Sequence, residues 1–217
     1  MRLFDYAASC NCYKVRLLLA QLERECELVP TDIFAGETLT PEFAARNPAR
    51  TTPVLELDDG RNLPESAAIL TYLATGTPLL PDDPLQRAEV VGWLAYEQAE
   101  VIPAVAGLRF RLQTGRLAPD DPGADSRRRA GHVVLDTLER HLAAAGDYFV
   151  GERYSIADVA LYGYLHVAEE AGYGLEAHPR LDAWRQRVRE RPRHMNDVAP
   201  YPPNAAPGAG RSIYDLM

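Results

Sequence analysis

The chain has 217 residues, of which 47% are hydrophobic and 25% are charged, a composition typical of a folded water-soluble protein. Its formal net charge of -8 argues against nucleic acid as the main partner, and its apolar runs are far shorter than the ~20 residues of a membrane-spanning helix. The amino terminus lacks the pattern of a signal peptide, so we expect a cytoplasmic protein with no membrane partner. The spacing of the three cysteines and five histidines favours reduced thiols and no metal site.

Short apolar segments alternate with helical patterns in the first third of the chain. The spacing of Val15, Leu18 and Leu22 predicts a helix, and Asp59-Gly60 predicts a tight hairpin turn because this pair readily adopts positive φ angles. The expected elements are a strand at 2–6, a helix at 13–22, a strand at 27–33, at most a short helix near 41–48, a hairpin of 54–57 and 61–63, and a helix at 65–73. This order matches a thioredoxin-like α/β domain with a parallel first half and a terminal hairpin, placed at 1–76.

The pattern changes after a proline-rich linker at 77–84. Long helical patterns cover 85–113 and 126–145, separated by a loop at 119–123, and predict an all-α domain over 85–192. Within it, Ser155 and Asp158 have the spacing of a capping box, which we interpret as structural. Residues 193–217 are rich in proline, glycine and alanine, and are expected to form a tail that does not pack as an element, either mobile or draped over a cleft.

A candidate site for thiol chemistry lies before the first helix, where the sequence reads Ser9-Cys10-Asn11-Cys12. Free amides at a helix start favour a negative charge, so a thiolate would be stabilised there. The Ser9 hydroxyl, the Asn11 amide and the thiols of Cys10 or Cys12 could each supply or stabilise one. The alternative is a structural role, with Ser9 as helix N-cap and Cys12 as a small buried side chain, and the local sequence taken alone favours this alternative.

Two further segments have binding potential. Pro53 stands directly before a predicted strand, where a cis Thr52-Pro53 bond would leave the Thr52 main chain able to pair with a peptide-like ligand; an edge strand that begins with proline is the alternative. Glu65 and Ser66 open the next helix, where they suit a helix start. They could equally bind the ammonium and carboxylate groups of a ligand.

Together these segments resemble the soluble glutathione transferase family over about residues 1–192, through the order of Ser9, Thr52-Pro53, Glu65-Ser66 and the late capping box. The resemblance implies a thioredoxin-like domain that binds glutathione and a helical domain that supplies most of the acceptor pocket. It also implies that Thr52 pairs with the cysteinyl unit of glutathione, that Pro53 is cis, and that Glu65 and Ser66 hold the γ-glutamyl end.

One position departs from the family. Members often carry Lys or Gln just before the threonine, to bind the glycine carboxylate of glutathione, whereas this chain has Thr51 preceded by Arg50. Arg50 is therefore the candidate substitute.

The loop around Ser9 and Asn11 is most similar to bacterial members related to the Nu class. That similarity implies disulfide reduction with glutathione as well as, or instead of, conjugation, with Ser9 as hydrogen-bond donor to the sulfur and Asn11 as a second donor or a positioning group for a disulfide. Compared with glutaredoxins, Ser9 stands at the nucleophile and Cys12 at the resolving position. A mixed disulfide between Cys10 and glutathione, as in some cysteine-type transferases, is the second choice.

The leading hypothesis is thus a homodimeric glutathione-dependent enzyme of detoxification type with no metal. It would stabilise the glutathione thiolate for transfer to a small hydrophobic electrophile, or for disulfide or peroxide reduction. The alternatives are a non-catalytic module of the same fold, such as a stringent-starvation-type regulator or a ligand carrier, and a thiol transferase that depends on Cys10.

Overall fold

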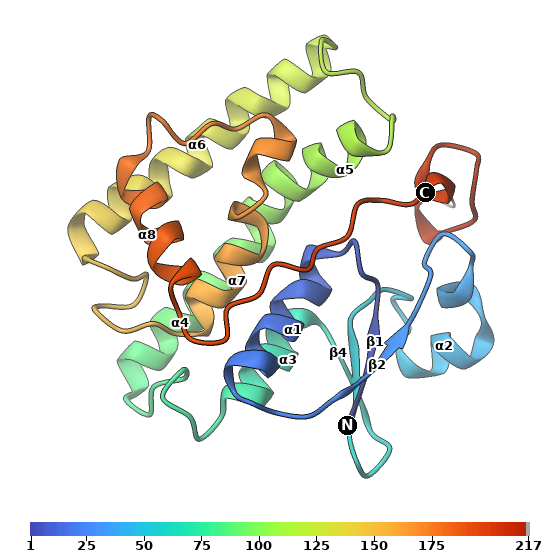
Figure 1. Cartoon of the computed structure of the whole chain (residues 1–217), viewed down its shortest axis with the longest axis horizontal. Helices are drawn as coiled ribbons and strands as arrows, with labels where there is room; N and C mark the ends of the chain where they lie inside the picture. Colours follow the sequence, from blue (N-terminus) through green and yellow to red (C-terminus); the bar gives the residue numbers. More distant parts are fainter. Residues whose placement is uncertain (216–217) are drawn as a thin grey trace. The chain divides into compact units, whose positions relative to one another are not determined.

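The computed structural model describes residues 1–215 and divides into two compact units. The first unit contains Met1–Leu73 and the segment that begins at Met195, and the second contains Ala74–His194 (Figure 1). The first unit carries the sheet and the second is helical, which confirms the predicted fold class.

A mixed sheet of four strands, in the order β2-β1-β3-β4, forms the centre of the first unit. β1 pairs with β2 in parallel and with β3 antiparallel, and β3 pairs antiparallel with β4, so the predicted parallel half and terminal hairpin are both present. The elements of this unit are β1 (Arg2–Asp5), α1 (Cys10–Gln21), β2 (Glu27–Pro30), the 3-10 helix η1 (Glu37–Leu39), α2 (Pro41–Arg46), β3 (Val54–Glu56), β4 (Asn62–Pro64) and α3 (Ser66–Ala74).

Side chains alternate between the two faces of the sheet. Phe4 and Val54 face α2, where they form a buried cluster with Phe43. Leu3 and Leu55 lie opposite each other in the register and are fully buried on the other face. Figure 1 shows α1 and α3 on that side of the sheet and α2 on the opposite side.

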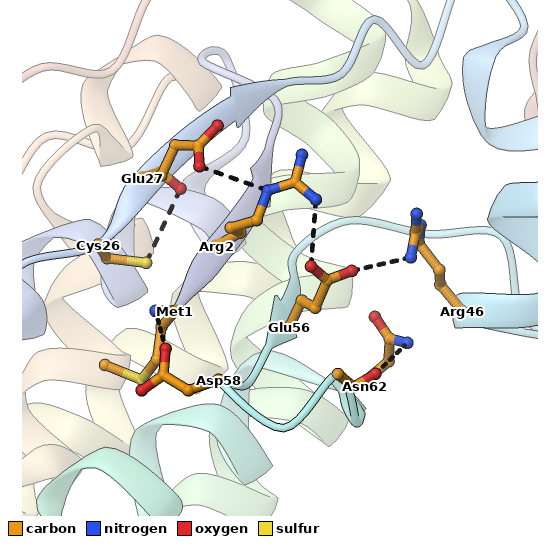
Figure 2. A network of polar contacts seen from close by, with 9 residues as sticks. Met1, Arg2, Cys26, Glu27, Arg46, Glu56, Asp58 and Asn62 are labelled. Atoms are coloured by element: carbon orange, nitrogen blue, oxygen red, sulfur yellow. Dashed lines mark hydrogen bonds and ion pairs between the residues drawn. The ribbon is translucent and has the colours of Figure 1, made fainter.

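Charged side chains fix the register on the α2 side (Figure 2). Arg2 lies between Glu27 on β2 and Glu56 on β3, with N···O distances of 3.4 and 3.1 Å, and Glu56 also pairs with Arg46 at 2.9 Å. The Arg46 guanidinium lies 4.7 Å from the centre of the Phe4 ring. Since such partly exposed pairs are each worth only about 0–1 kcal/mol, their main effect is to favour one strand alignment over its neighbours.

The second unit contains α4 (Pro84–Tyr96), the π-helix η2 (Glu97–Ala106), α5 (Gly107–Gln113), α6 (Pro122–Ala145), α7 (Ile156–Leu165), the 3-10 helix η3 (Ala168–Ala171) and α8 (Pro179–Arg189). Every residue of α7 is buried. None of the helices within residues 1–215 is long and apolar enough to cross a membrane.

Two helix predictions in this unit need correction. The helix expected at 85–113 contains the π-helical stretch η2 around Pro103, whose missing amide hydrogen and bulky ring are incompatible with regular α-helical hydrogen bonds. The helix expected to begin at 126 begins at Pro122, because Pro122 suits a first helical position and Asp121 caps it by accepting from the Gly123 amide at 2.6 Å.

The capping box predicted at the start of α7 is confirmed. The fully buried Asp158 accepts hydrogen bonds from the Ser155 amide at 2.9 Å and from the Trp184 indole nitrogen at 2.9 Å. A third bond comes from the Phe149 amide at 3.1 Å. Burial raises the pKa of this carboxyl to about 6 in spite of these donors. Asp158 therefore links the start of α7 to α8 and to the loop before α7.

The carboxy-terminal segment also departs from expectation. Residues 195–215, which we call the strap, belong to the first unit and contain the 3-10 helices η4 (Pro203–Ala205) and η5 (Ile213–Asp215). Ala205 and Ser212 are fully buried. The strap, red in Figure 1, thus packs against the N-terminal domain although its composition suggested a loose tail.

Candidate functional site

Ser9 stands between the end of β1 and the start of α1. Its backbone is extended, with φ −83° and ψ 121°, and its hydroxyl oxygen accepts from the Cys12 amide at 3.3 Å. Its carbonyl accepts from the Tyr13 amide at 2.9 Å. Ser9 is thus the N-cap of α1, and this is why the helix begins at Cys10 and not at 13. The hydroxyl hydrogen is not used by the cap, so the same side chain can also act as a donor.

The Cys12 sulfur lies inside this loop and is fully buried. Burial raises the pKa of the Cys12 thiol to about 12, with a further increase from the nearby charge of Asp5. The side chains of Thr52 and Ser9 interact with the sulfur and oppose the increase. Cys12 is therefore a protonated, inaccessible thiol at neutral pH, and it marks the place where the side chains of Ser9 and Thr52 come together.

Thr52 precedes a cis peptide bond at Pro53, as the family resemblance implied. Within residues 1–215 the Thr52 main chain makes no hydrogen bond, whereas the preceding loop is firmly held by Asn47. Asn47 is buried; its side-chain amide donates to the Thr51 carbonyl at 2.9 Å, and its side-chain oxygen accepts from the Ala49 amide at 3.0 Å. The Thr52 main chain is thus presented in a fixed position for an external partner.

The starts of α1 and α3 meet through a side-chain hydrogen bond. The Ser66 hydroxyl donates to the Asn11 side-chain oxygen at 3.2 Å, and Ser66 is 3% exposed. The Asn11 side-chain nitrogen makes no hydrogen bond to the described residues, so its hydrogens can be donated to a ligand. Two helix starts, each with free amides, therefore lie beside Asn11 and favour bound anions.

Glu65 and Arg50 both have positive φ angles, 70° and 56°, which are uncommon for residues other than glycine. Such conformations cost of order 1–3 kcal/mol and occur preferentially at functional sites. In the part of the chain that the structure describes, neither side chain forms an ion pair, so both charges can bind a ligand. Within residues 1–215 no hydrogen bond or ion pair joins Arg50 to the other predicted site residues, so Arg50 is the least constrained member of the set.

The cysteines differ in accessibility, which gives a direct test of the site. Cys10 is 2% exposed and Cys12 is fully buried, whereas Cys26 is partly exposed. In the native protein we expect only Cys26 to react with a soluble thiol reagent, and to react faster as the pH rises, because burial raises the pKa of its thiol. Counting modified thiols before and after unfolding checks this, with Cys26→Ser as control. Rapid native modification of Cys10 would contradict the packing of the loop.

Comparison with known proteins identifies the family. The chain matches the N-terminal domain of glutathione S-transferases over residues 3–79 and their C-terminal domain over residues 91–192. The chain belongs to the glutathione S-transferase family. The predicted family and enzyme class are therefore confirmed, whereas the likeness to the Nu class stays a prediction.

Solved and curated relatives agree with this assignment. A crystal structure of a glutathione S-transferase from Pseudomonas fluorescens has a TM-score of 0.87 and 41% identity, covering 91% of this chain and 98% of its own. A maleylacetoacetate isomerase from Pseudomonas aeruginosa is 33% identical over 191 residues, 83% of this chain and 87% of the relative. The disulfide-bond oxidoreductase YfcG from Escherichia coli is 30% identical over 200 residues, with coverages of 86% and 89%. These names cover different reactions, so family membership fixes a glutathione-dependent activity but not the acceptor.

The transferase thus brings most of the predicted residues into one region: Ser9 and Thr52 meet around Cys12, and Asn11 meets Ser66. Sequence reasoning missed Asn47, whose side chain holds the loop before Thr52 by bonding to Thr51 and Ala49. An Asn in a loop often folds the chain by bonding its own neighbours, so its position before Pro48 was the available signal. Among residues 1–215, no group of His, Cys, Asp or Glu side chains could hold a metal ion.

Proposed function

We propose that this transferase holds glutathione on its N-terminal domain and uses the Ser9 hydroxyl to stabilise the glutathione thiolate for attack on a second substrate. The observation that carries the proposal is the hydrogen bonding of Ser9. Its oxygen accepts from the Cys12 amide, so the hydroxyl hydrogen remains to be donated, and the protein sulfur with which the side chain interacts is a neutral, buried thiol. A thiolate is a stronger acceptor than a neutral thiol, so an incoming glutathione sulfur competes well for this donor.

The chemical effect of this donor is on the ionisation of glutathione. A hydrogen bond to a charged group contributes about 1.5–3 kcal/mol, which corresponds to a decrease of about 1–2 units in the pKa of the bound thiol. The proton that leaves the sulfur passes to solvent. Asn11 supports the same charge through its side-chain nitrogen, which makes no hydrogen bond to the described residues.

The rest of the tripeptide is assigned to groups around this point. We assign the Thr52 main chain to the cysteinyl unit, since it is held in place but not bonded within residues 1–215. Glu65 and Ser66 are assigned to the γ-glutamyl ammonium and carboxylate, and Arg50 to the glycine carboxylate. The helix start at Ser66 and the unpaired charges of Glu65 and Arg50 support these assignments.

Two reactions follow from a held thiolate. The sulfur can attack an electrophilic carbon, whose leaving group departs with its electron pair, or it can attack a disulfide, releasing one sulfur as a thiolate and forming a mixed disulfide with glutathione. Neither route oxidises a residue of the enzyme. The burial of Cys10 weighs against the alternative in which that cysteine carries glutathione.

The cellular setting is part of the proposal. Three free cysteines fit a reducing, cytoplasmic compartment. The exposed apolar side chains of Leu85 and Val91 on α4 support a homodimer, which the mass of the protein in solution would test.

Glutathione binding can be measured by titration calorimetry on the full chain. We expect Ser66→Ala to weaken binding by about 10- to 100-fold. On binding, the single hydroxyl hydrogen of Ser66 turns from the Asn11 oxygen to the ligand carboxylate, and this hydrogen bond to a charged group is lost in the variant. Thr137→Ala, which removes a hydroxyl of the helical unit that donates to the Val133 carbonyl at 2.9 Å, should bind like the native protein. Equal affinity of Ser66→Ala and the native protein would contradict the assigned γ-glutamyl contact. Binding without turnover of any electrophile or disulfide would instead favour a non-catalytic module.

A further inference from the structure

The first half of the strap is hydrogen-bonded to α1 and to the loop after β1. The Tyr13 hydroxyl donates to the Met195 carbonyl at 2.7 Å. Arg16 donates through two nitrogens to the two oxygens of Asp197, both at 2.9 Å, and the Ala199 amide donates to the Ala7 carbonyl at 3.1 Å. Arg16 is nearly buried and also pairs with Asp5. A paired guanidinium of this kind is a strong and directional anchor.

The second half of the strap is hydrogen-bonded to the loop after β2. Asn204 donates to Asp32 at 2.8 Å, and the Arg211 amide donates to the Phe34 carbonyl at 2.7 Å. The backbone approach is so close at Gly210 that a Cβ there would lie 2.4 Å from the Asn204 carbonyl oxygen and 2.6 Å from the Phe34 carbonyl oxygen. The sequence therefore provides glycine where the strap and the loop touch.

These hydrogen bonds hold the Tyr214 ring beside the loop that carries the candidate glutathione site. Its ring centre lies 6.3 Å from that of Phe34, which in turn packs against Tyr6 at 5.9 Å. Phe34 and Tyr6 are buried, whereas Tyr214 is 46% exposed, so Tyr214 is the accessible face of this group of rings. The Tyr6 amide donates to the Cys12 sulfur at 3.4 Å, and the Tyr6 carbonyl accepts from the Ser9 amide at 2.9 Å, so this group of rings adjoins the loop that carries Ser9.

We infer that Tyr214 is a specificity-determining residue of this transferase, which the strap positions as a wall for acceptor molecules that carry a flat aromatic group. The inference rests on the proposed function, since it concerns the second substrate of the same site. The Tyr214 amide donates to the Ser212 hydroxyl oxygen at 3.2 Å, and Ser212 is fully buried. The main chain that carries the Tyr214 ring is therefore held in place. The strap also lies beyond residue 192, where the match to the family's C-terminal domain ends.

The test compares two electrophiles that undergo the same kind of conjugation, chlorodinitrobenzene and iodomethane. Tyr214→Ala should lower kcat/KM for the aromatic acceptor by about 2- to 10-fold, the usual range for one ring contact, and leave that for iodomethane unchanged. Tyr214→Phe should keep most of the aromatic activity. Leu28→Ala, which removes a comparably exposed apolar side chain from β2, is the matched control. Equal losses for both acceptors, or none, would overturn the inference.

The role of the strap is tested by a double-mutant cycle. Asp197→Ala removes the Arg16 anchor and should reproduce the selective loss of Tyr214→Ala, whereas the combined variant should lose no more than either single one. Additive losses would overturn the idea that Asp197 acts through Tyr214. Glutathione affinity is measured for every variant. Failure of the native protein to bind glutathione would refute the proposed function itself, whereas normal binding without acceptor selectivity would refute only the role of Tyr214.

Discussion

Replacing Ser9 with alanine is expected to lower kcat/KM for conjugation by about 10- to 100-fold at neutral pH, the kinetic equivalent of one hydrogen bond to a charged sulfur. The donor favours the ionised form of the thiol and so lowers its pKa; its removal raises that pKa. The loss should therefore be largest at neutral pH and should shrink as the pH rises above the thiol pKa of the variant. A pH profile of kcat/KM for both proteins measures this directly.

Two controls separate this effect from the capping role of Ser9. Ser9→Thr keeps a hydroxyl at the N-cap and should retain most of the activity. Asp83→Ala removes a cap elsewhere, where Asp83 accepts from the Gln86 amide at 2.9 Å, and should affect stability but not the pH profile. An unchanged kcat/KM in Ser9→Ala would mean that another group stabilises the thiolate.

Asp158→Ala is expected to lower the free energy of unfolding by about 3–6 kcal/mol, far more than the loss of an ordinary helix cap. The substitution leaves several buried donors without an acceptor. The donors are the amides of Ser155 and Phe149 and the indole of Trp184, and Asp158 itself is fully buried. A loss of this size is a large fraction of the ~5–15 kcal/mol by which proteins are usually stable.

The measurement is a denaturant unfolding curve for native and variant proteins. Asp158→Asn keeps one carbonyl oxygen as acceptor and should lose less than Asp158→Ala. Thr40→Ala removes a helix N-cap of ordinary kind, where Thr40 accepts from the Phe43 amide at 3.2 Å, and should cost only about 1 kcal/mol. If Asp158→Ala costs no more than Thr40→Ala, the capping box does not have the central role in the helical unit that its contacts indicate.

The features that the sequence predicted are those with local causes. The strand and helix order follows from apolar periodicity, and the capping box from the spacing of Ser155 and Asp158. The cis bond at Pro53 came from the resemblance, not from the dipeptide, since most bonds of this kind are trans. The paired arrangement of Asn11 and Ser66 joins residues 55 positions apart and no local pattern reveals it.

The strap is the segment that departs most from what its sequence predicted. Its composition is that of a segment unable to bury much apolar surface, which is why we expected a tail that does not pack as an element, either mobile or draped over a cleft. It is held instead by main-chain hydrogen bonds, as between Arg211 and Phe34, and by the bond of Arg16 to Asp197, 181 positions away. Main-chain bonds leave no signature in side-chain composition, and a single distant ion pair leaves no periodicity, so neither could be found from one sequence.

The most direct test of thiolate stabilisation is the ionisation of glutathione on the enzyme, followed through the ultraviolet absorption of the thiolate as the pH is raised. The account predicts that glutathione bound to the native protein ionises about 1–2 units below the ~8.5 typical of a free cysteine thiol, and that Ser9→Ala moves the transition back toward that value. A bound thiol that ionises at its free value in the native protein would contradict the account, as would an equal decrease in Ser9→Ala.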